Sequence, residues 1–499
     1  MMPSGVRGLI RWSLIVGFGL TAGMTIGNPV AVMWMLMSVL VMTSVAVTRG
    51  RLESLLGLYM VLVAVVNLVK RLLFVAGPVD QSLYHQIQAA PFIMLLVMLV
   101  ISVRRFYRIP WVFGDFLVGL FFLMSIGFTM WKSVVSGAVA EGTVSLIRYS
   151  GATLGYYVGR TLDRTVWKSL SGVLGWVFAG TLALAFWQFA FGPTYVDAMW
   201  ARCTADTSVQ AVKVVSSMAG LEPMRAYATF SDPLAWGLFL VLVWVVVEAG
   251  REEQGDKVGR KVLRRGFFLA ALTLTLSRSP LLAGAAMLCF QWVLRLRTVG
   301  RPGVLLTLFA GSFYGVVVMI EYLLENVLKA SWFPNFASPF LSRMLDIGTL
   351  TQRGYALEEW GRAIRDYTFS GVGWHEHASL TSGAATSALF QSHNGIISLV
   401  LVVGIPGLLV VIIWFASWMR GVTLALRSEL TEERVMLRWA VAMVLGYAST
   451  VFVSGPQFMN EFFWLMMGWT TTLSMSRGMK DKNHSPVRED GAASLGGAA

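Results

Sequence analysis

The sequence predicts an all-α fold, a polytopic membrane helix bundle of about 12–14 transmembrane helices. Of its 499 residues, 56% are hydrophobic and 13% are charged, whereas about a quarter of an average soluble domain is charged. The mean hydropathy is +0.66, and long apolar runs recur along the chain. So few charges cannot cover the surfaces of the two or three soluble domains that this length would require. The composition therefore excludes a cytosolic enzyme, a nucleic-acid-binding protein and a secreted disulfide scaffold.

Each predicted helix corresponds to an apolar run, since a membrane-spanning helix needs about 20 mostly apolar residues. Suitable runs occupy 9–26, 29–47, 52–69, 87–103, 111–131, 142–159, 167–190, 232–249, 264–277, 279–294, 303–323, 393–415, 439–453 and 459–475. The first run lacks a small-residue cleavage site and another run follows at once. We therefore expect it to be a retained helix and not a signal peptide.

The connections divide the chain into one integral membrane domain, 1–478, and a tail, 479–499. The tail is polar and rich in Gly and Ala, which predicts a disordered cytoplasmic segment. Two connections, 191–231 and 324–392, are too long to be simple turns, and loops of this length are usually functional. No internal repeat is evident, which argues against transporters built from repeated halves.

The net charge of +13 is predicted to orient the chain in the membrane. With the N-terminus inside, about two thirds of the 40 Lys and Arg residues fall in cytoplasmic segments, as the positive-inside rule requires. The acidic residues divide about evenly between the two sides. Both termini are therefore expected in the cytoplasm, and both long loops on the outer side.

The segment 264–294 could form either one long helix or two short helices. A single helix would place the arginines of 295–301 outside, against the charge rule. Ser279 followed by Pro280 is also typical of a helix start, a capping hydroxyl and then proline at the first helical position. We therefore expect two helices, with Arg278 in the outer turn between them.

Three of the predicted helices that begin on the outer face start beside candidate residues, and each presents free backbone N–H groups and the positive end of a helix dipole. Arg225 and Arg278 precede two of these starts, and the planar guanidinium binds phosphate oxygens two at a time. Together these features predict a phosphate or pyrophosphate site. His393 lies at the third start, where a neutral imidazole could act as a general base. The helix starts are Asp232-Pro233, Ser279-Pro280 and Ser392-His393. The alternatives are interfacial anchors for the arginines and a polar cap residue for the histidine.

Other candidates lie on the same side. Arg148 stands one turn before the glycines of 151–159, whose spacing predicts a close-packing face. Arg353 and Arg362 lie in the second long loop, where the alternative is a solvated amphipathic helix. The residues Gly404-Ile405-Pro406-Gly407 predict a helix kink. No metal site or cofactor is expected, because the segment His375-Glu376-His377 lacks the spacing of metal ligands on one helix face.

In combination these motifs resemble the O-antigen ligase and polymerase superfamily of membrane glycosyltransferases. The resemblance extends over roughly residues 140–475. The segments that carry it are Ser392-His393-Asn394-Gly395 with Gly404 to Leu408, Leu276 to Ser279, Arg225 to Pro233, and Arg353 through Trp360 to Gly373. The sequence departs from the family pattern at Asp232 and at Ser279-Pro280.

The resemblance implies transfer or polymerisation of an undecaprenyl-pyrophosphate-linked oligosaccharide on the periplasmic face of the bacterial inner membrane. The reaction would be inverting and would use neither a metal nor a nucleotide sugar. By this resemblance His393 deprotonates the acceptor hydroxyl, and Arg225 and Arg278 bind the pyrophosphate. By the same resemblance Arg353 would help to position the donor or the loop. Arg148 and Arg362 are candidate positioning residues from their place in the sequence and not from the resemblance.

The sequence leaves several functions open. A polymerase would join repeat units for O-antigen or exopolysaccharide, whereas a ligase would transfer the chain to a lipid core or a protein. A lipid-linked oligosaccharide flippase or another transporter is an alternative from a different class, although it would place its cations in a central cavity. A structural partner in an envelope complex is a further alternative. Expected partners are the lipid-linked donor, a saccharide or lipid-core acceptor, the bilayer, and flippase and chain-length or export proteins, with no nucleic acid.

Overall fold

The structure, a computed structural model, is helical in every regular element of the part of the chain that it describes. The described residues are 44–45, 48, 51–76, 87, 90–163, 165–203, 226–230, 233–253, 257–275, 277–295, 369–374, 395–427, 431–450 and 460–483. Within them, five helices are long and apolar enough to cross a membrane, in the segments Leu52–Leu72, Phe113–Val135, Ser169–Phe191, Pro233–Glu252 and Ser398–Leu426. The chain is therefore an all-α, multi-pass membrane protein, which confirms the predicted fold class.

Every predicted span that falls on described residues contains a helix, and 142–159 is divided among α7, η1 and α8. The spans 9–26 and 303–323, and most of 29–47, lie outside the described residues. The helices are α3 (Leu52–Ala76), α5 (Ala90–Phe106), α6 (Phe113–Val135), α7 (Val139–Ser150), the 3-10 helix η1 (Gly151–Thr153), α8 (Leu154–Thr161), α9 (Val166–Phe191), α10 (Tyr195–Cys203), α12 (Pro233–Glu253), α13 (Val258–Thr273), α14 (Arg278–Val293), α19 (Gly395–Arg427), α20 (Thr431–Thr450) and α21 (Glu461–Asn483).

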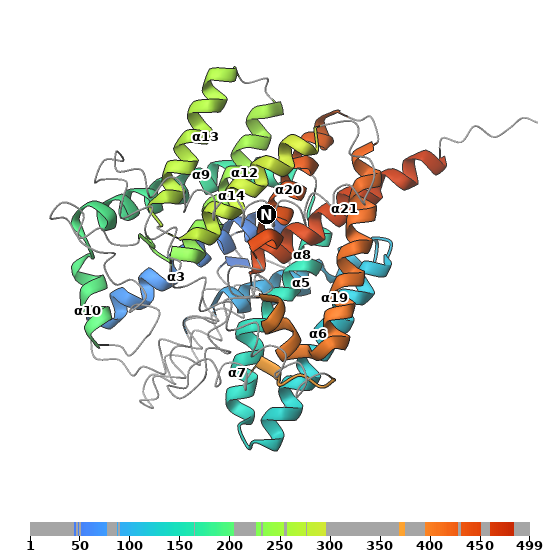
Figure 1. Cartoon of the computed structure of the whole chain (residues 1–499), viewed down its shortest axis with the longest axis horizontal. Coiled ribbons are helices and arrows are strands. Elements are labelled where there is room, and N and C mark those ends of the chain that lie inside the picture. Colours follow the sequence, from blue (N-terminus) through green and yellow to red (C-terminus); the bar gives the residue numbers. More distant parts are fainter. Residues whose placement is uncertain are drawn as a thin grey trace, which may run out of the picture.

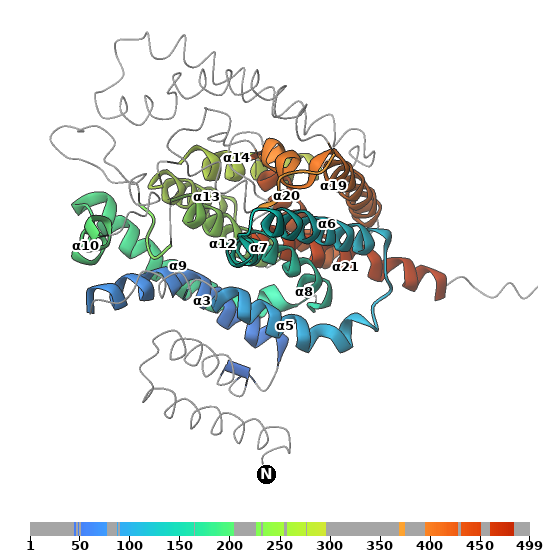
Figure 2. The same cartoon turned by 90° about the horizontal axis from the view of Figure 1, so that it is seen from below.

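The helices pack as two groups that meet at α21. In Figures 1 and 2, α6 and α19 lie side by side in the first group, and α12, α13 and α14 lie together with α20 in the second. α21 packs against α8, α19 and α20, and α20 in turn packs against α12 and α14. α12 is the most deeply buried of the five candidate spans. A helix apolar on all sides is the expected occupant of such a central place.

The glycines of 151–159 form a close-packing face, as predicted. Gly159 approaches the carbonyl oxygen of Leu465 in α21 so closely that a methyl group there would collide with it. Gly468 has the same relation to the carbonyl oxygen of Tyr156. Without a hydrophobic driving force between helices in lipid, such small-residue contacts are a main source of helix association.

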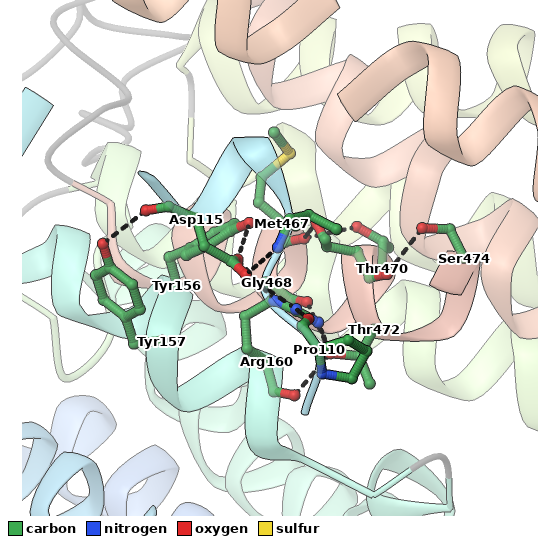
Figure 3. A network of polar contacts seen from close by, with 12 residues as sticks. Pro110, Asp115, Tyr156, Tyr157, Arg160, Met467, Gly468, Thr470, Thr472 and Ser474 are labelled. Carbon is green, nitrogen blue, oxygen red and sulfur yellow. Dashed lines mark hydrogen bonds and ion pairs between the residues drawn. The ribbon is translucent and has the colours of Figure 1, made fainter. Parts of the chain in front are cut away.

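A buried ion pair joins α6 to α8 beside this contact (Figure 3). Arg160 donates from Nε to Asp115 Oδ1 at 2.8 Å and from Nη2 to Oδ2 at 3.1 Å, and both side chains are 0% exposed. The Tyr156 hydroxyl donates to the same carboxylate at 2.9 Å. Arg160 also donates to Thr472 Oγ1 of α21 and to the carbonyl oxygen of Pro110. The opposite charges of Arg160 and Asp115 compensate each other inside the bundle, and the Nε, Nη1 and Nη2 atoms of Arg160 each have a hydrogen-bond acceptor.

Two glutamates tie together the ends of the second helix group. Glu248 of α12 accepts from Arg264 and Arg265 of α13. Glu252 accepts from Arg295, from Arg438 at 2.8 Å and from the indole N–H of Trp439 at 2.8 Å. The end of the bundle rich in Lys and Arg is therefore also crosslinked by ion pairs.

The predicted division of 264–294 is confirmed, because α13 ends at Thr273 and α14 begins at Arg278. The helix start differs from the prediction. The extended N-cap is Ser277, so Arg278 is the first helical residue, and Pro280 the third. Proline is compatible with this place because no N–H in the first turn has an intrahelical acceptor.

The helix α21 runs to Asn483, so its last residues extend into the segment expected to be a disordered tail. Residues 479–482 include Met and Lys, which favour helix, and extending an existing helix adds one hydrogen bond per residue. Residues 484–499 lie outside the described part.

Candidate functional site

Most of the predicted site residues lie outside the described residues. This holds for His393, Arg225, Arg353 and Arg362. For two others the structure describes only the backbone. Arg148 lies in α7, and Arg278 is the first residue of α14. The described segments near these residues are 226–230, 277–295, 369–374 and 395–427.

The segment 226–230 follows Arg225 directly and is held by a buried ion pair. Arg71 of α3 donates to Asp197 Oδ1 of α10 at 2.6 Å, and the two side chains are 4% and 2% exposed. The same guanidinium donates to the carbonyl oxygens of Ala228, at 3.5 Å, and Phe230. One arginine thus joins two helices and the loop between α10 and α12.

Gln188 of α9 completes this group of contacts. Its Nε2 donates to Asp197 Oδ2 at 3.0 Å and to the carbonyl oxygen of Ala228 at 3.2 Å. Its Oε1 accepts from the backbone N–H groups of Tyr227, at 3.1 Å, and Ala228, at 2.8 Å. We call Arg71, Asp197 and Gln188 the loop-holding network. It keeps Ala228 at φ 50°, a conformation that residues other than glycine adopt rarely.

Tyr227 adds an aromatic face to the network. The Arg71 guanidinium lies 4.6 Å from the centre of its ring, a cation–π contact. Burial, together with the nearby Asp197 carboxylate, raises the pKa of Tyr227. The phenol is therefore neutral at physiological pH, and the single negative charge of Asp197 balances Arg71.

The loop also joins the turn that precedes α14. The backbone N–H of Ala226 donates to the carbonyl oxygen of Leu274 at 3.0 Å. Close by, Gly237 in the second turn of α12 contacts the ring of Pro280 in the first turn of α14. Ala226, the residue after Arg225, is therefore bonded to the turn that leads to Arg278, and the N-terminal turns of α12 and α14 are adjacent.

The structure brings a second pair of predicted motifs together. Gly371 packs against the carbonyl oxygen of Val402, and a methyl group on Gly404 would lie 2.8 Å from the carbonyl oxygen of Phe369. Gly404 interrupts α19 with φ 67°, which confirms the predicted kink. The N–H of Val372 donates to the carbonyl oxygen of Leu401 at 2.5 Å. The segment 369–374 of the second long loop is thus fixed on the broken helix.

Trp374 anchors the same segment to α6. Its indole N–H donates to Ser125 Oγ at 2.8 Å, and Ser125 Oγ lies 2.5 Å from Ser150 Oγ of α7. Its backbone N–H donates to Thr129 Oγ1 at 3.1 Å. These contacts fix residues 369–374, which lie within the second long loop, against α6.

Several polar groups near these segments were missed by the sequence analysis. Thr229 lies in the loop with a buried hydroxyl that has no hydrogen-bond partner among the described residues. Glu461 begins α21, where Asn460 Oδ1 caps the helix by accepting from the N–H groups of Phe462 and Phe463. The signal that could have found the acidic groups is a carboxylate at the edge of an apolar run.

The arrangement favours binding of an anion. Two helix N-termini lie together, and their first-turn N–H groups have no intrahelical acceptor. The network neutralises Arg71 with Asp197, so it adds no net charge of its own. Among the described residues no group of three or more potential metal ligands is present, and His375 and His377 lie outside that part.

The comparisons with known proteins add no relative. A scan against protein-family models finds no match to this chain, and a search of curated proteins finds none either.

Proposed function

We propose that this chain is a membrane-embedded glycosyltransferase of the O-antigen ligase and polymerase type. It transfers or polymerises an undecaprenyl-pyrophosphate-linked oligosaccharide on the periplasmic face of the bacterial inner membrane. Support comes from the sequence motifs quoted above and from the adjacency of the segments that flank two of them.

The observation that carries the proposal is the hydrogen bond from the N–H of Ala226 to the carbonyl oxygen of Leu274. Arg225 directly precedes Ala226, and Arg278 follows Leu274 by four residues, across the turn between α13 and α14. Two arginines whose neighbours lie so close, at the N-terminal turns of α12 and α14, suit a pyrophosphate better than either arginine alone.

In the proposed reaction the acceptor hydroxyl attacks the anomeric carbon of the donor. A bond forms between the acceptor oxygen and that carbon, while the bond from carbon to the pyrophosphate oxygen breaks. The acceptor proton passes to His393, and undecaprenyl pyrophosphate leaves with the electron pair. Arg225, Arg278 and the helix dipoles stabilise the charge that develops on the leaving group. Attack from the opposite face inverts the anomeric configuration, and no metal or nucleotide sugar takes part.

The remaining predicted residues receive supporting roles. Arg353, Arg362 and Arg148 position the substrate or the large loop. The proposed partners are a saccharide or lipid-core acceptor, the bilayer, and flippase and chain-length or export proteins.

The proposal is tested in cells by replacing Arg225, Arg278 and His393 with Ala. Arg260→Ala is the matched control, since Arg260 is exposed on α13. With equal amounts of protein in the membrane, the three variants should lose extracellular polysaccharide and accumulate the lipid-linked intermediate, and the control should not. Polymer of normal amount and length from all three variants would contradict the proposal.

The acceptor decides between the two forms of the reaction. A polymerase variant would leave single repeat units on the lipid carrier, whereas a ligase variant would leave full-length chains there. Accumulation of the intermediate on the cytoplasmic face would instead indicate the flippase alternative. A chelator should leave the reaction unchanged, and inhibition by it would make His375 and His377 candidates for a metal site.

A further inference from the structure

We propose that the loop-holding network, Arg71, Asp197 and Gln188, positions Arg225 for the pyrophosphate of the donor. This inference rests on the proposed function and deepens it. The three side chains do not touch the substrate, so they are positioning residues.

The first support is the number of backbone groups that the network occupies. In the loop, the carbonyl oxygens of Ala228 and Phe230 accept from Arg71. The N–H groups of Tyr227 and Ala228 donate to Gln188 Oε1. Outside the network, the N–H groups of Ala226 and Phe230 donate to the carbonyl oxygens of Leu274 and Tyr227. Because four of the five N–H groups between 226 and 230 have partners, the loop has little freedom to shift.

The second support is that the network is unfavourable for folding stability in two respects. A charged pair that is almost fully buried is seldom more stabilising than an apolar contact of the same size. Ala228 is also held in the left-handed region of φ, which is unfavourable for a residue with a Cβ. Unfavourable conformations of this kind persist where the surroundings fix them, and they are concentrated at functional sites.

The third support is the place of the network relative to the membrane. Gln188 lies near the end of α9, whereas Arg160 lies just before α9 begins. From Val166 to Gln188 the helix rises about 33 Å, so the two buried ion pairs lie at opposite ends of one membrane span. The Arg160 pair joins helices and the turn at Pro110. The Arg71 pair, in contrast, binds the segment 226–230, which lies next to Arg225. The two pairs are therefore matched in burial but not in function.

The loop itself is tested first, without any assay of activity. In hydrogen–deuterium exchange of the purified full-length protein, residues 226–230 should be protected. Arg71→Lys retains the charge but removes the planar fork, and should accelerate exchange in this segment. Asp197→Asn, a milder change, should do so to a smaller extent. Arg160→Lys is the control and should leave the segment protected. Unchanged exchange in both network variants would overturn the proposal.

The link to the ligand is tested with inorganic pyrophosphate as the probe and with steady-state kinetics. Arg225→Ala should abolish pyrophosphate binding, and Arg71→Lys should weaken it while Arg160→Lys does not. For transfer, Arg71→Lys should lower kcat/KM by about 100-fold, the effect typical of a displaced binding group, mainly through KM for the donor. A purely structural role would instead lower the yield of folded protein at unchanged KM.

The outcomes separate the two proposals. If the wild-type protein binds pyrophosphate, Arg225→Ala loses it and Arg71→Lys retains it fully, the positioning role is wrong and the proposed function stands. If neither the wild-type protein nor any variant binds pyrophosphate, the proposed function fails and the positioning role fails with it.

Discussion

At the scale of single residues, this membrane protein uses buried charge in two ways. Asp115 and Arg160 are fully enclosed and each accepts or donates to several partners, so they fasten α6, α8 and α21 together. Asp197 and Arg71 are nearly as buried, but the remaining hydrogen bonds of Arg71 go to a loop. The two pairs differ in the acceptors that the other N–H groups of each arginine reach. Those of Arg160 reach α21 and the turn at Pro110, whereas those of Arg71 reach the segment 226–230 next to the predicted site.

Replacing one member of the first pair should be far more damaging than replacing both. Asp115→Ala leaves the Arg160 guanidinium buried without its anion, which costs about 3–5 kcal/mol of folding stability. The double variant, with Asp115→Ala and Arg160→Met, removes both charges and should recover much of this loss. Thermal unfolding in detergent measures both. Equal destabilisation by the single and double variants would contradict this account of the pair.

Thr229 should show opposite effects on stability and on activity. Its buried hydroxyl lacks a partner among the described residues, so Thr229→Val should stabilise the protein by about 1 kcal/mol. If the hydroxyl binds the donor, KM should rise in the same variant. Thr153→Val is the matched control, since Thr153 also has a buried hydroxyl without a partner in the described part but lies in η1. It should raise the melting temperature and leave KM unchanged.

At the scale of elements, the sequence predicted the breaks well because breaks have local causes. The charge rule and Ser279-Pro280 placed the division between α13 and α14, and the residues after Val403 predicted the interruption of α19. Partner choice was not predictable, because Asp115 and Arg160 are 45 residues apart and meet only through packing. The loop conformation at Ala228 was not predictable either, since alanine gives no signal for a positive φ.

The kink of α19 should depend on Gly404. An alanine there would adopt an unfavourable φ of 67° and would also press on the carbonyl oxygen of Phe369 at 2.8 Å. Gly404→Ala should therefore lower the melting temperature and accelerate hydrogen exchange in 369–374. The control is Gly421→Ala in the same helix, where the nearest atom, Ser474 Oγ, lies at an ordinary 3.7 Å. Similar behaviour of the two variants would show that the break does not need glycine.

At the scale of the whole molecule, the proposed function requires both long loops to lie on the periplasmic side of the membrane. Tyr195 in α10 and Arg260 in α13 are exposed, and they lie on the first long loop and on a segment predicted to be cytoplasmic. In a protein with Cys203 and Cys289 replaced by Ser, a membrane-impermeant thiol reagent should label Tyr195→Cys in intact cells. It should label Arg260→Cys only after the membrane is opened. The reverse pattern would place the predicted site on the cytoplasmic face.

The structure confirms the predicted fold class but does not describe most of the predicted site residues. Arg225, Arg353, Arg362 and His393 lie outside the described residues, so their roles remain predictions. What the structure adds is the framework around them, the loop held by Arg71 and the segment 369–374 held on α19. Sequence patterns identify residue types suited to the chemistry, but the distances between them depend on packing that no local pattern encodes.

The most direct test of the central claim is reconstitution. The purified protein in liposomes is supplied with an undecaprenyl-pyrophosphate-linked oligosaccharide and an acceptor saccharide, and the products are followed by mass spectrometry. The account predicts a lengthened or transferred saccharide of inverted anomeric configuration, equimolar release of undecaprenyl pyrophosphate, and neither product from His393→Ala. Recovery of the donor unchanged from the wild-type protein, or its appearance intact on the other side of the bilayer, would contradict it.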